Sequence, residues 1–286
     1  MGRTLEIILG PTGVGKTGFS IERALEYGSP IISCDSRQIF KEIPIGTAAP
    51  SAQDLARVKH YFIGTYSVTE PYTAARYENE ALALIDRLFS EGHERLVMTG
   101  GSMLYIDAVC NGLDDIPEVP ISLRAHLMDC LRSEGLAVLT EQLRELDPAT
   151  WERIDRSNPH RVIRALEVSL YTGQPFSSFQ THTSRKRDFE IVKTGLMRER
   201  EELYERIDRR AIEMVEGGLE EEARRMVPYR DLPALQTVGY REFFEYFDGL
   251  RDLDSTIALI QRNSRHYAKR QLTWWHRDPS IRWIEL

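Results

Sequence analysis

One glycine-rich segment carries the clearest chemistry of the sequence: Gly10-Pro11-Thr12-Gly13-Val14-Gly15-Lys16-Thr17. Two glycines separated by four residues, followed by a lysine and a hydroxyl residue, match the phosphate-loop pattern. The glycines let backbone N–H groups converge on phosphate oxygens, and a following helix adds a partial positive charge. Lys16 would neutralise the terminal phosphates, and the Thr17 hydroxyl stands where a Mg²⁺ ligand belongs. The segment predicts a polyphosphate ligand without specifying which; a chance glycine turn is the alternative.

Asp35 ends the strand expected after the loop helix. Ligands of open parallel sheets gather at the carboxyl ends of strands, so Asp35 should face the same crevice as the loop. A carboxylate there can accept a proton from an incoming nucleophile. An N-cap or magnesium-shell aspartate is the alternative. The strand end at 98–102 carries no aspartate of the kind that holds the metal of an ATPase, which disfavours ATP as the ligand.

Arginines and lysines gather in three further segments. Residues 261–277 contain five Arg or Lys and no acid, and Arg262, Arg265 and Lys269 share one helical stripe that suits an RNA backbone. A solvated basic face with buried tryptophans is the alternative. A second cluster lies at Arg153, Arg156, His160, Arg161 and Arg164, which suggests that RNA is contacted by two modules. Arg206 and Arg210 lie one turn apart and could clamp phosphate oxygens, unless they pair with Glu202 or Glu213.

Strand-like and helix-like runs alternate in most of the chain, which predicts an α/β fold with a mostly parallel sheet. The expected strands are 5–9, 30–34, 61–64, 96–99, 189–197 and 281–286. Between them, 113–188 has the pattern of a helical insertion and includes a polar segment at 177–187 that is expected to be mobile. Within it, Asn158-Pro159 predicts the N-cap and first-turn proline of a helix at 159–171. We therefore predict a P-loop NTPase-like core at 1–112 and 189–286, with helices on both faces of its sheet.

Bulk properties narrow the class of protein. The chain has 286 residues, 42% of them hydrophobic, and a net charge of −7, which argues against indiscriminate binding to nucleic acid. No long uncharged apolar stretch predicts a membrane span. The three cysteines form no close pair and are expected to be reduced thiols of a cytoplasmic protein.

Seven segments together resemble the tRNA dimethylallyltransferase (isopentenyltransferase) family. Beyond the phosphate loop they are Asp35-Ser36-Arg37-Gln38, Ile45-Gly46-Thr47-Ala48, Gly100-Gly101-Ser102-Met103-Leu104-Tyr105, residues 158–167 (Asn158 to Glu167), Val238-Gly239-Tyr240-Arg241 and Lys269-Arg270-Gln271-Leu272-Thr273-Trp274. One such word would mean little, but their order and spacing over nearly the whole chain are specific.

The resemblance implies a prenyl transfer from dimethylallyl diphosphate to N6 of adenine 37, beside the tRNA anticodon. Asp35 would be the general base, with Lys16, Ser102 and Arg210 as the other catalytic residues. The diphosphate would be held by residues 10–17, Arg206 and Mg²⁺, with Thr17 as the metal ligand. A monomer is expected. A prenyltransferase acting on free AMP, ADP or ATP, a small-molecule kinase and a nucleotide-switched RNA-binding protein are the rivals.

The resemblance also implies a set of contacts with the anticodon stem-loop. They fall on Asp35, Ser36, Arg37, Gln38, Ser102, Arg124, His160, Arg161, Val162, Ile163, Arg164, Gln236, Thr237, Val238, Gly239, Tyr240, Arg241, Lys269, Arg270, Gln271, Thr273, Trp274 and His276. Two departures from the family pattern bear on them. Ser102 replaces a frequent threonine and keeps its hydroxyl, whereas His160 replaces a frequent glutamine and changes the hydrogen bond available to RNA.

Overall fold

The computed structural model describes residues 2–181 and 184–286. The chain forms two compact units, which we call the core unit (Met1–Cys110 with Lys186–Leu286) and the insertion unit (Asn111–Arg185). His182 and Thr183, inside the segment expected to be mobile, lie outside the described residues. No helix in the described part of the chain is long and apolar enough to cross a membrane.

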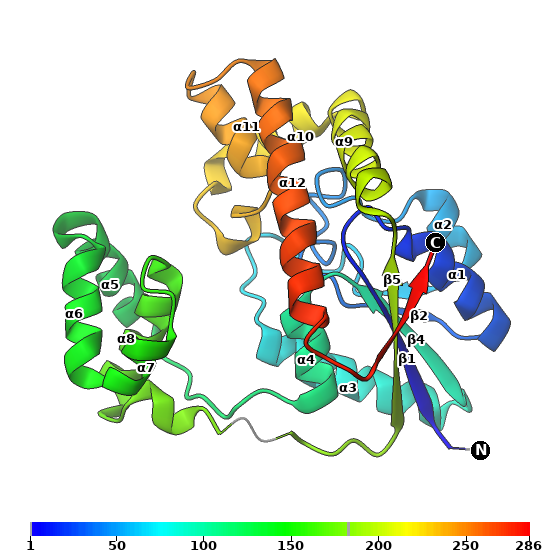
Figure 1. The fold of residues 1–286 in the computed structure, drawn as a ribbon, viewed down its shortest axis with the longest axis horizontal. Coiled ribbons are helices and arrows are strands. Elements are labelled where there is room, and N and C mark those ends of the chain that lie inside the picture. Colours follow the sequence, from blue (N-terminus) through cyan, green and yellow to red (C-terminus); the bar gives the residue numbers. More distant parts are fainter. Residues whose placement is uncertain (1, 182–183) are drawn as a thin grey trace. The chain divides into compact units, whose positions relative to one another are not determined.

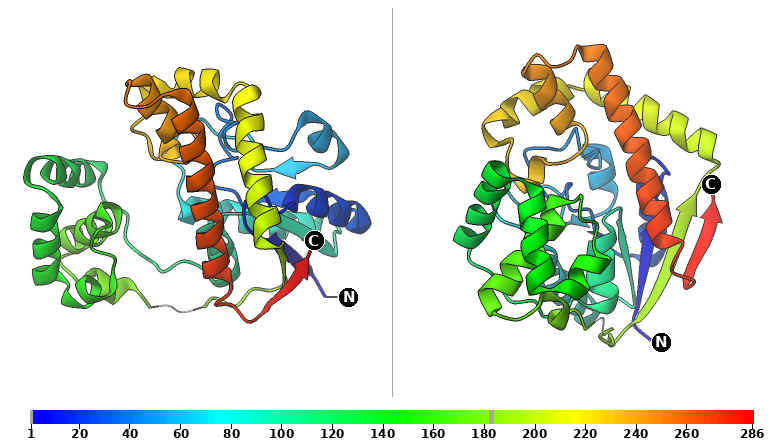
Figure 2. Two further views of the ribbon diagram at one scale, coloured as in Figure 1. Left: turned by 45° about the horizontal axis from the view of Figure 1, so that its top comes forward. Right: turned by 60° about the vertical axis from the view of Figure 1, so that its left-hand side comes forward.

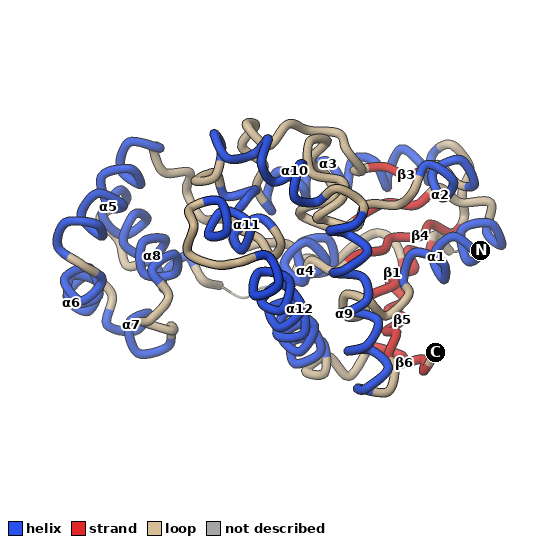
Figure 3. The backbone as a smooth tube through the Cα atoms, turned by 90° about the horizontal axis from the view of Figure 1, so that it is seen from above, coloured by secondary structure: helices blue, strands red, loops and turns tan. Residues whose placement is uncertain are grey.

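A parallel sheet forms the centre of the core unit. Its strands within the described residues are β1 (Thr4–Leu9), β2 (Ile31–Ser33), β3 (His60–Tyr61), β4 (Arg95–Gly100), β5 (Glu190–Met197) and β6 (Ile281–Glu285). They lie side by side in the order β3-β2-β4-β1-β5-β6 (Figure 3). Every neighbouring pair is parallel. The α/β fold predicted from the alternation of strands and helices is confirmed.

Helices cover both faces of this sheet. The helices of the core unit within the described residues are α1 (Lys16–Tyr27), α2 (Ala52–Arg57), α3 (Ala74–Ser90), α4 (Met103–Asn111), α9 (Arg200–Glu216), α10 (Leu219–Met226), α11 (Tyr240–Phe247) and α12 (Leu253–Trp275). Successive residues of a strand point to opposite faces. Accordingly Ile8 of β1 packs with Ile21 of α1 and Ile207 of α9, whereas Ile7 packs with Ile85 of α3 and Ile106 of α4.

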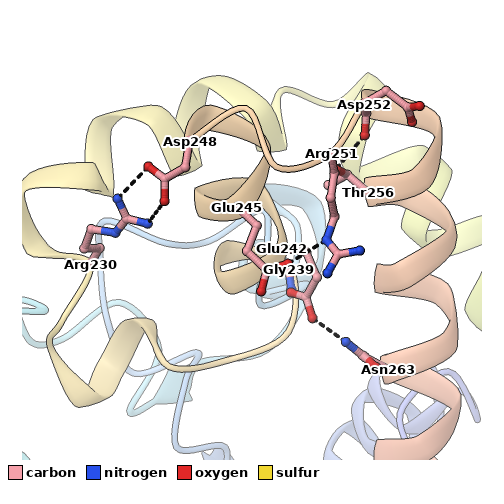
Figure 4. Close-up of polar contacts among 9 residues, drawn as sticks. All are labelled: Arg230, Gly239, Glu242, Glu245, Asp248, Arg251, Asp252, Thr256 and Asn263. Carbon is pink, nitrogen blue, oxygen red and sulfur yellow. Dashed lines mark hydrogen bonds and ion pairs between the residues drawn. The ribbon is translucent and has the colours of Figure 1, made fainter. Parts of the chain in front are cut away.

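Helices α9 to α12 form a group beyond the carboxyl ends of the strands (Figure 1). Here α12 packs against α9 (Figure 2, left), and Gln261 of α12 donates a hydrogen bond to the Asp208 carbonyl of α9. The buried carboxylate of Glu242 joins α11 to α12, since it accepts from Gly239 N at 2.7 Å and from Asn263 Nδ2 at 2.6 Å (Figure 4). Helices α9 to α12 thus cover the carboxyl ends of the strands as one packed group.

The insertion unit is helical, as predicted. It contains α5 (Ile121–Glu134), α6 (Leu136–Leu146), α7 (Pro148–Arg153), α8 (Pro159–Thr172) and the 3-10 turn Phe176–Phe179. Leu127, Leu143 and Leu166 belong to its own hydrophobic core, separate from the clusters of the core unit. Asn158 caps α8 by accepting from the N–H groups of His160 and Arg161, which matches its predicted role.

The structure corrects one strand and adds three helices. The strand expected at 61–64 is shifted to His60–Tyr61, because Phe62 and Gly64 have positive φ and end the extended chain. Helices α7, α10 and α11 were not predicted. All three are short, with six to eight residues, so their hydrophobic periodicity is weak.

We expect the stability of the insertion unit to depend on Asp147, whose side chain is 0% exposed. Its carboxylate accepts from the N–H and hydroxyl of Thr150 and from the N–H and hydroxyl of Ser177. Asp147→Ala leaves these donors unsatisfied and should cost about 3 kcal/mol locally. Hydrogen exchange should accelerate in α7 and α8 and stay unchanged in β1 and β4. Asp155→Ala, at an exposed turn, is the control; equal exchange in the two variants would contradict the prediction.

Candidate active site

The phosphate loop connects β1 to α1, as the sequence predicts. Gly10 has φ +151° and Gly13 has φ +83°, a region that favours glycine. A Cβ at Gly10 would lie 2.7 Å from the Leu196 carbonyl oxygen, and one at Gly13 would lie 2.8 Å from Cγ1 of Ile207. The glycines are thus required both by backbone conformation and by the close approach of β5 and α9.

Three arginine side chains donate hydrogen bonds to the phosphate loop. Arg198 Nε donates to the Val14 carbonyl and Arg206 Nε to the Gly13 carbonyl, each at 2.9 Å. Arg210 donates to the Thr12 hydroxyl at 3.2 Å. Glu202 pairs with Arg198 and not with Arg206, so the geometry favours the loop-facing interpretation of Arg206 and Arg210. Arg198 was missed; its place just after the carboxyl end of β5 was the available signal.

Lys16 folds back over the loop. Its Nζ donates to the carbonyls of Gly10 at 2.8 Å and Pro11 at 2.9 Å. Burial and the charge of Arg210 lower the pKa of Lys16 to about 8, although Asp35 opposes this shift. Burial and the charge of Arg206 also lower the pKa of Arg210, but an arginine stays protonated near neutral pH. The concentrated positive charge makes this end of the crevice a strong site for an anion.

A cavity of about 690 Å³ opens beside the loop. This volume is within the usual range of pockets for small molecules and cofactors. Its walls come from the loop and from residues 35–38, 46–48 and 236–239, and from Tyr267, Arg270 and Gln271 of α12. Gly100 and Gly101 also line it, so the cavity brings together residues from six of the seven segments that resemble the family.

Asp35 lines this cavity. Its Oδ1 accepts from the N–H groups of Arg37 at 2.9 Å and Gln38 at 3.3 Å, so the carboxylate caps a turn at 36–39 and not a helix. Within the described residues its Oδ2 takes part in no hydrogen bond. One oxygen fixes the direction of the carboxylate, and the other remains able to accept a proton.

Ser102 supports the Asp35 turn. It is 8% exposed; its Oγ accepts from Ser36 N at 2.7 Å and donates to the Ser36 hydroxyl at 2.9 Å. The Ser102 hydroxyl therefore supports the Asp35 turn, and the catalytic and tRNA contacts expected of Ser102 stay predictions.

The wall at 45–48 is held from behind by Glu222, which is 1% exposed. Its carboxylate accepts from Ile45 N at 3.0 Å, Gly46 N at 2.8 Å and the Tyr240 hydroxyl. A Cβ at Gly46 would lie 2.5 Å from that hydroxyl, which explains the glycine. Gln38 holds the same wall through the carbonyls of residues 47 and 48. Glu222 was missed because the acidic run 220–222 is typical of a solvated helix start.

The residues assigned to tRNA divide by exposure. Exposed side chains are those of Arg124, His160, Arg161, Gln236, Arg241, Lys269, Arg270, Thr273, Trp274 and His276, while Ser36, Arg37, Gln38, Arg164, Thr237 and Val238 are half-buried. Val162, Ile163, Tyr240 and Gln271 are buried. The expected RNA contact is corrected for three of these side chains, because Val162 and Ile163 belong to the insertion core and Tyr240 to the core around Phe243. Gln271 binds the phosphate loop and also lines the cavity, so its contact with RNA stays a prediction. The backbone of Gly239 is likewise buried.

Within the insertion unit, Arg124 and Arg164 converge on one carboxylate. Glu167, which is 1% exposed, accepts two hydrogen bonds from Arg124 and one from Arg164 at 2.6–2.7 Å. Two positive charges against one negative charge leave this group cationic. Its arrangement keeps both guanidinium groups at the surface, where a phosphate oxygen can reach them.

The residues present fit a magnesium ion that arrives with its ligand. The described residues contain no group of three His, Cys, Asp or Glu side chains placed to hold a metal. Mg²⁺ bound with phosphates needs few protein ligands, because phosphate oxygens and water supply the rest. The Thr17 hydroxyl at the start of α1 is the residue that would contribute.

Comparison with known proteins agrees with the resemblance. The IPP transferase family model matches residues 38–278. A "tRNA dimethylallyltransferase 2" of Porphyromonas gingivalis is 55% identical over 98% of this chain and 93% of its own length, and one of Parabacteroides distasonis is 51% identical over 98% and 94%. The full-length tRNA isopentenylpyrophosphate transferase of Bacillus halodurans has a TM-score of 0.70 at 35% identity, covering 99% of this chain and 90% of that one. A eukaryotic dimethylallyltransferase described as acting on tRNA has a TM-score of 0.80 at 25% identity, over 99% and 74%.

The shifted pKa of Lys16 predicts a pH dependence of anion binding. Lys16 is charged below its pKa of about 8 and loses that charge as the pH rises. The affinity of the empty site for inorganic diphosphate should therefore fall up to about tenfold between pH 7 and pH 9. Isothermal titration calorimetry with Mg²⁺ measures this, and Lys16→Met corrects for titration of diphosphate itself. An equal pH dependence in the two proteins would remove Lys16 from the anion site.

Proposed function

The chain belongs to the IPP transferase family of tRNA dimethylallyltransferases, which are prenyltransferases with a P-loop NTPase-like fold, and on this premise we propose its specific reaction. It transfers the dimethylallyl group of dimethylallyl diphosphate to N6 of adenine 37, next to the tRNA anticodon. Inorganic diphosphate is released.

One observation carries this proposal: the phosphate loop and the Asp35 carboxylate open onto the same cavity. An anion held by the loop and a nucleophile beside Asp35 would be neighbours there. The described strand ends bring no second acid beside the loop, which suits a leaving diphosphate better than hydrolysis of ATP.

The reaction is a displacement at C1 of the prenyl group. The lone pair of N6 attacks C1, the bond between C1 and the diphosphate oxygen breaks, and its electrons leave with the diphosphate. Asp35 accepts the proton that N6 loses. The N–H groups of the loop, Lys16 and Arg210 stabilise the negative charge that develops on the leaving group. Magnesium, when bound with the substrate, supplies further neutralisation of the phosphate oxygens.

The exposed basic residues supply the contacts for RNA. Lys269 and Arg270 are exposed on α12 close to the cavity, and Arg241 is exposed at the start of α11. A base inside a folded anticodon loop must leave its stack to reach a carboxylate inside a cavity. The tRNA is thus held through its backbone at the surface while the adenine enters the cavity beside Asp35.

The proposed function is tested by transfer of label from radiolabelled dimethylallyl diphosphate in the presence of Mg²⁺. Unmodified tRNA, the same tRNA with adenine 37 changed, free AMP, and ATP are compared. We expect label in the unmodified tRNA alone. Label in AMP alone would indicate a free-nucleotide prenyltransferase, and consumption of ATP without prenyl transfer would indicate a kinase or switch.

Replacement of Asp35 separates its capping role from its role as a base. The side-chain amide introduced by Asp35→Asn keeps an oxygen that can accept from Arg37 N and Gln38 N but cannot take a proton at neutral pH. Asp35→Asn should lower the single-turnover rate about 10²–10⁴-fold with tRNA affinity unchanged. Asp35→Ala should add a loss of tRNA affinity if the turn at 36–38 contacts RNA. Near-normal turnover by the asparagine variant would exclude Asp35 as the base.

Removal of two exposed cations should weaken tRNA binding through loss of phosphate contacts. For Lys269→Ala with Arg270→Ala, the slope of log Kd against log salt should become shallower by about 1.5. Filter binding at several salt concentrations gives this slope. Arg57→Ala removes an exposed arginine of α2 that pairs with Glu22 and serves as the control. If the slope of the double variant equals that of the wild type, Lys269 and Arg270 do not contact the RNA backbone.

A further inference from the structure

We propose that Gln271 is a positioning residue for diphosphate binding: it fastens the phosphate loop to the end of β4 from a helix whose other side faces RNA. This inference rests on the proposed function for the identity of the anion. It differs from the tRNA contact that the sequence suggested for the same residue.

Gln271 is 1% exposed and uses both ends of its side-chain amide. Its Oε1 accepts from Thr12 N at 2.9 Å, and its Nε2 donates to the Gly101 carbonyl at 2.8 Å. A backbone N–H can only donate and a carbonyl can only accept, so the orientation of the amide is unambiguous. One side chain therefore bridges the loop after β1 and the strand end of β4.

The residue at position 101 is adapted to this bridge. A Cβ there would lie 2.6 Å from Nε2 of Gln271, so any side chain at Gly101 would displace the amide. Tyr267, one helical turn before Gln271, donates to the same carbonyl at 3.3 Å. Burial raises the pKa of Tyr267 to about 12, which keeps its hydroxyl available as a donor. Two side chains of α12 thus converge on one carbonyl.

The bridge also determines which loop groups remain for an anion. The N–H of Thr12 is already used by Gln271, and the Thr12 hydroxyl accepts from Arg210. Residue 12 is consequently held between α12 and α9 before any ligand arrives. Such preorganisation spares the ordering of the loop on binding, which would otherwise reduce affinity.

The two residues before Gln271 are exposed cations of the same helix. Lys269 lies on the far side of α12 from Gln271, whereas Arg270 lines the same cavity. One rigid helix thus carries the loop bridge together with cations available to RNA. This explains why residues with two different roles are adjacent in the segment Lys269-Arg270-Gln271.

The test compares Gln271→Met, Gln271→Asn and Gln261→Met in the full chain. Methionine preserves length without hydrogen bonds, and asparagine preserves the amide but is too short to bridge. Gln261 lies on the same helix and bonds α9 at Asp208, so it controls for general loosening of α12. Melting temperature, Kd for inorganic diphosphate with Mg²⁺, Kd for tRNA, KM for dimethylallyl diphosphate and kcat at saturating tRNA are measured for each variant.

Both Gln271 variants should raise Kd for diphosphate and KM for dimethylallyl diphosphate about tenfold, with tRNA Kd unchanged and a smaller change in kcat. Gln261→Met should lower the melting temperature similarly and leave Kd within about twofold. A folded Gln271→Met that binds diphosphate like the wild type, or equal losses in the control, would overturn the inference. Because diphosphate binding needs no tRNA, weakened binding in the Gln271 variants with no prenyl transfer by wild type would instead refute the proposed function.

Discussion

Fixation of the phosphate loop by side chains from distant parts of the chain is the constraint on which the rest of the site depends. Lys16 ties the first carbonyls of the loop, Arg206 and Arg210 approach from α9, and Gln271 approaches from α12. A loop of backbone N–H groups binds an anion strongly only when those groups already point inward, since ordering them on binding would cost affinity. Side chains of α9 and α12 therefore belong to the site, although the phosphate motif itself ends at residue 17.

The strand order explains why these distant residues meet. Placing β4 between β1 and β2 brings the loop, the Asp35 turn and the Gly100-Gly101 turn together at one edge of the sheet. Close backbone approach then accounts for the small residues: a Cβ at Gly100 would lie 2.5 Å from the backbone of Cys34. Two buried carboxylates fix the elements around the site by hydrogen bonds: Glu222 binds the backbone of the cavity wall at 45–48, and Glu242 joins α11 to α12.

The sequence was sufficient for the features that depend on local pattern. The phosphate loop, the capped helix at Pro159 and the alternation that implies a parallel sheet are all encoded within a few adjacent residues. Features that depend on tertiary contacts were not accessible in this way. Gln271 lies in a basic, exposed-looking segment, and only the packing of α12 against Gly101 shows that it is buried. The resemblance to the family also predicts RNA contacts for Val162, Ile163 and Tyr240, yet their side chains are buried in hydrophobic cores. The role of Glu222 could not be predicted because it belongs to a run of three acidic residues, which is typical of an exposed helix start.

A crystal structure with dimethylallyl thiolodiphosphate, a slowly reacting analogue, and Mg²⁺ would test the central claim most directly. The account predicts diphosphate oxygens on the N–H groups of residues 13–17, with Lys16 Nζ turned from the Gly10 carbonyl toward phosphate. It also predicts that C1 of the prenyl group faces Oδ2 of Asp35 across a space that one amine can fill. Diphosphate bound outside the loop, or a prenyl group directed away from Asp35, would contradict the account.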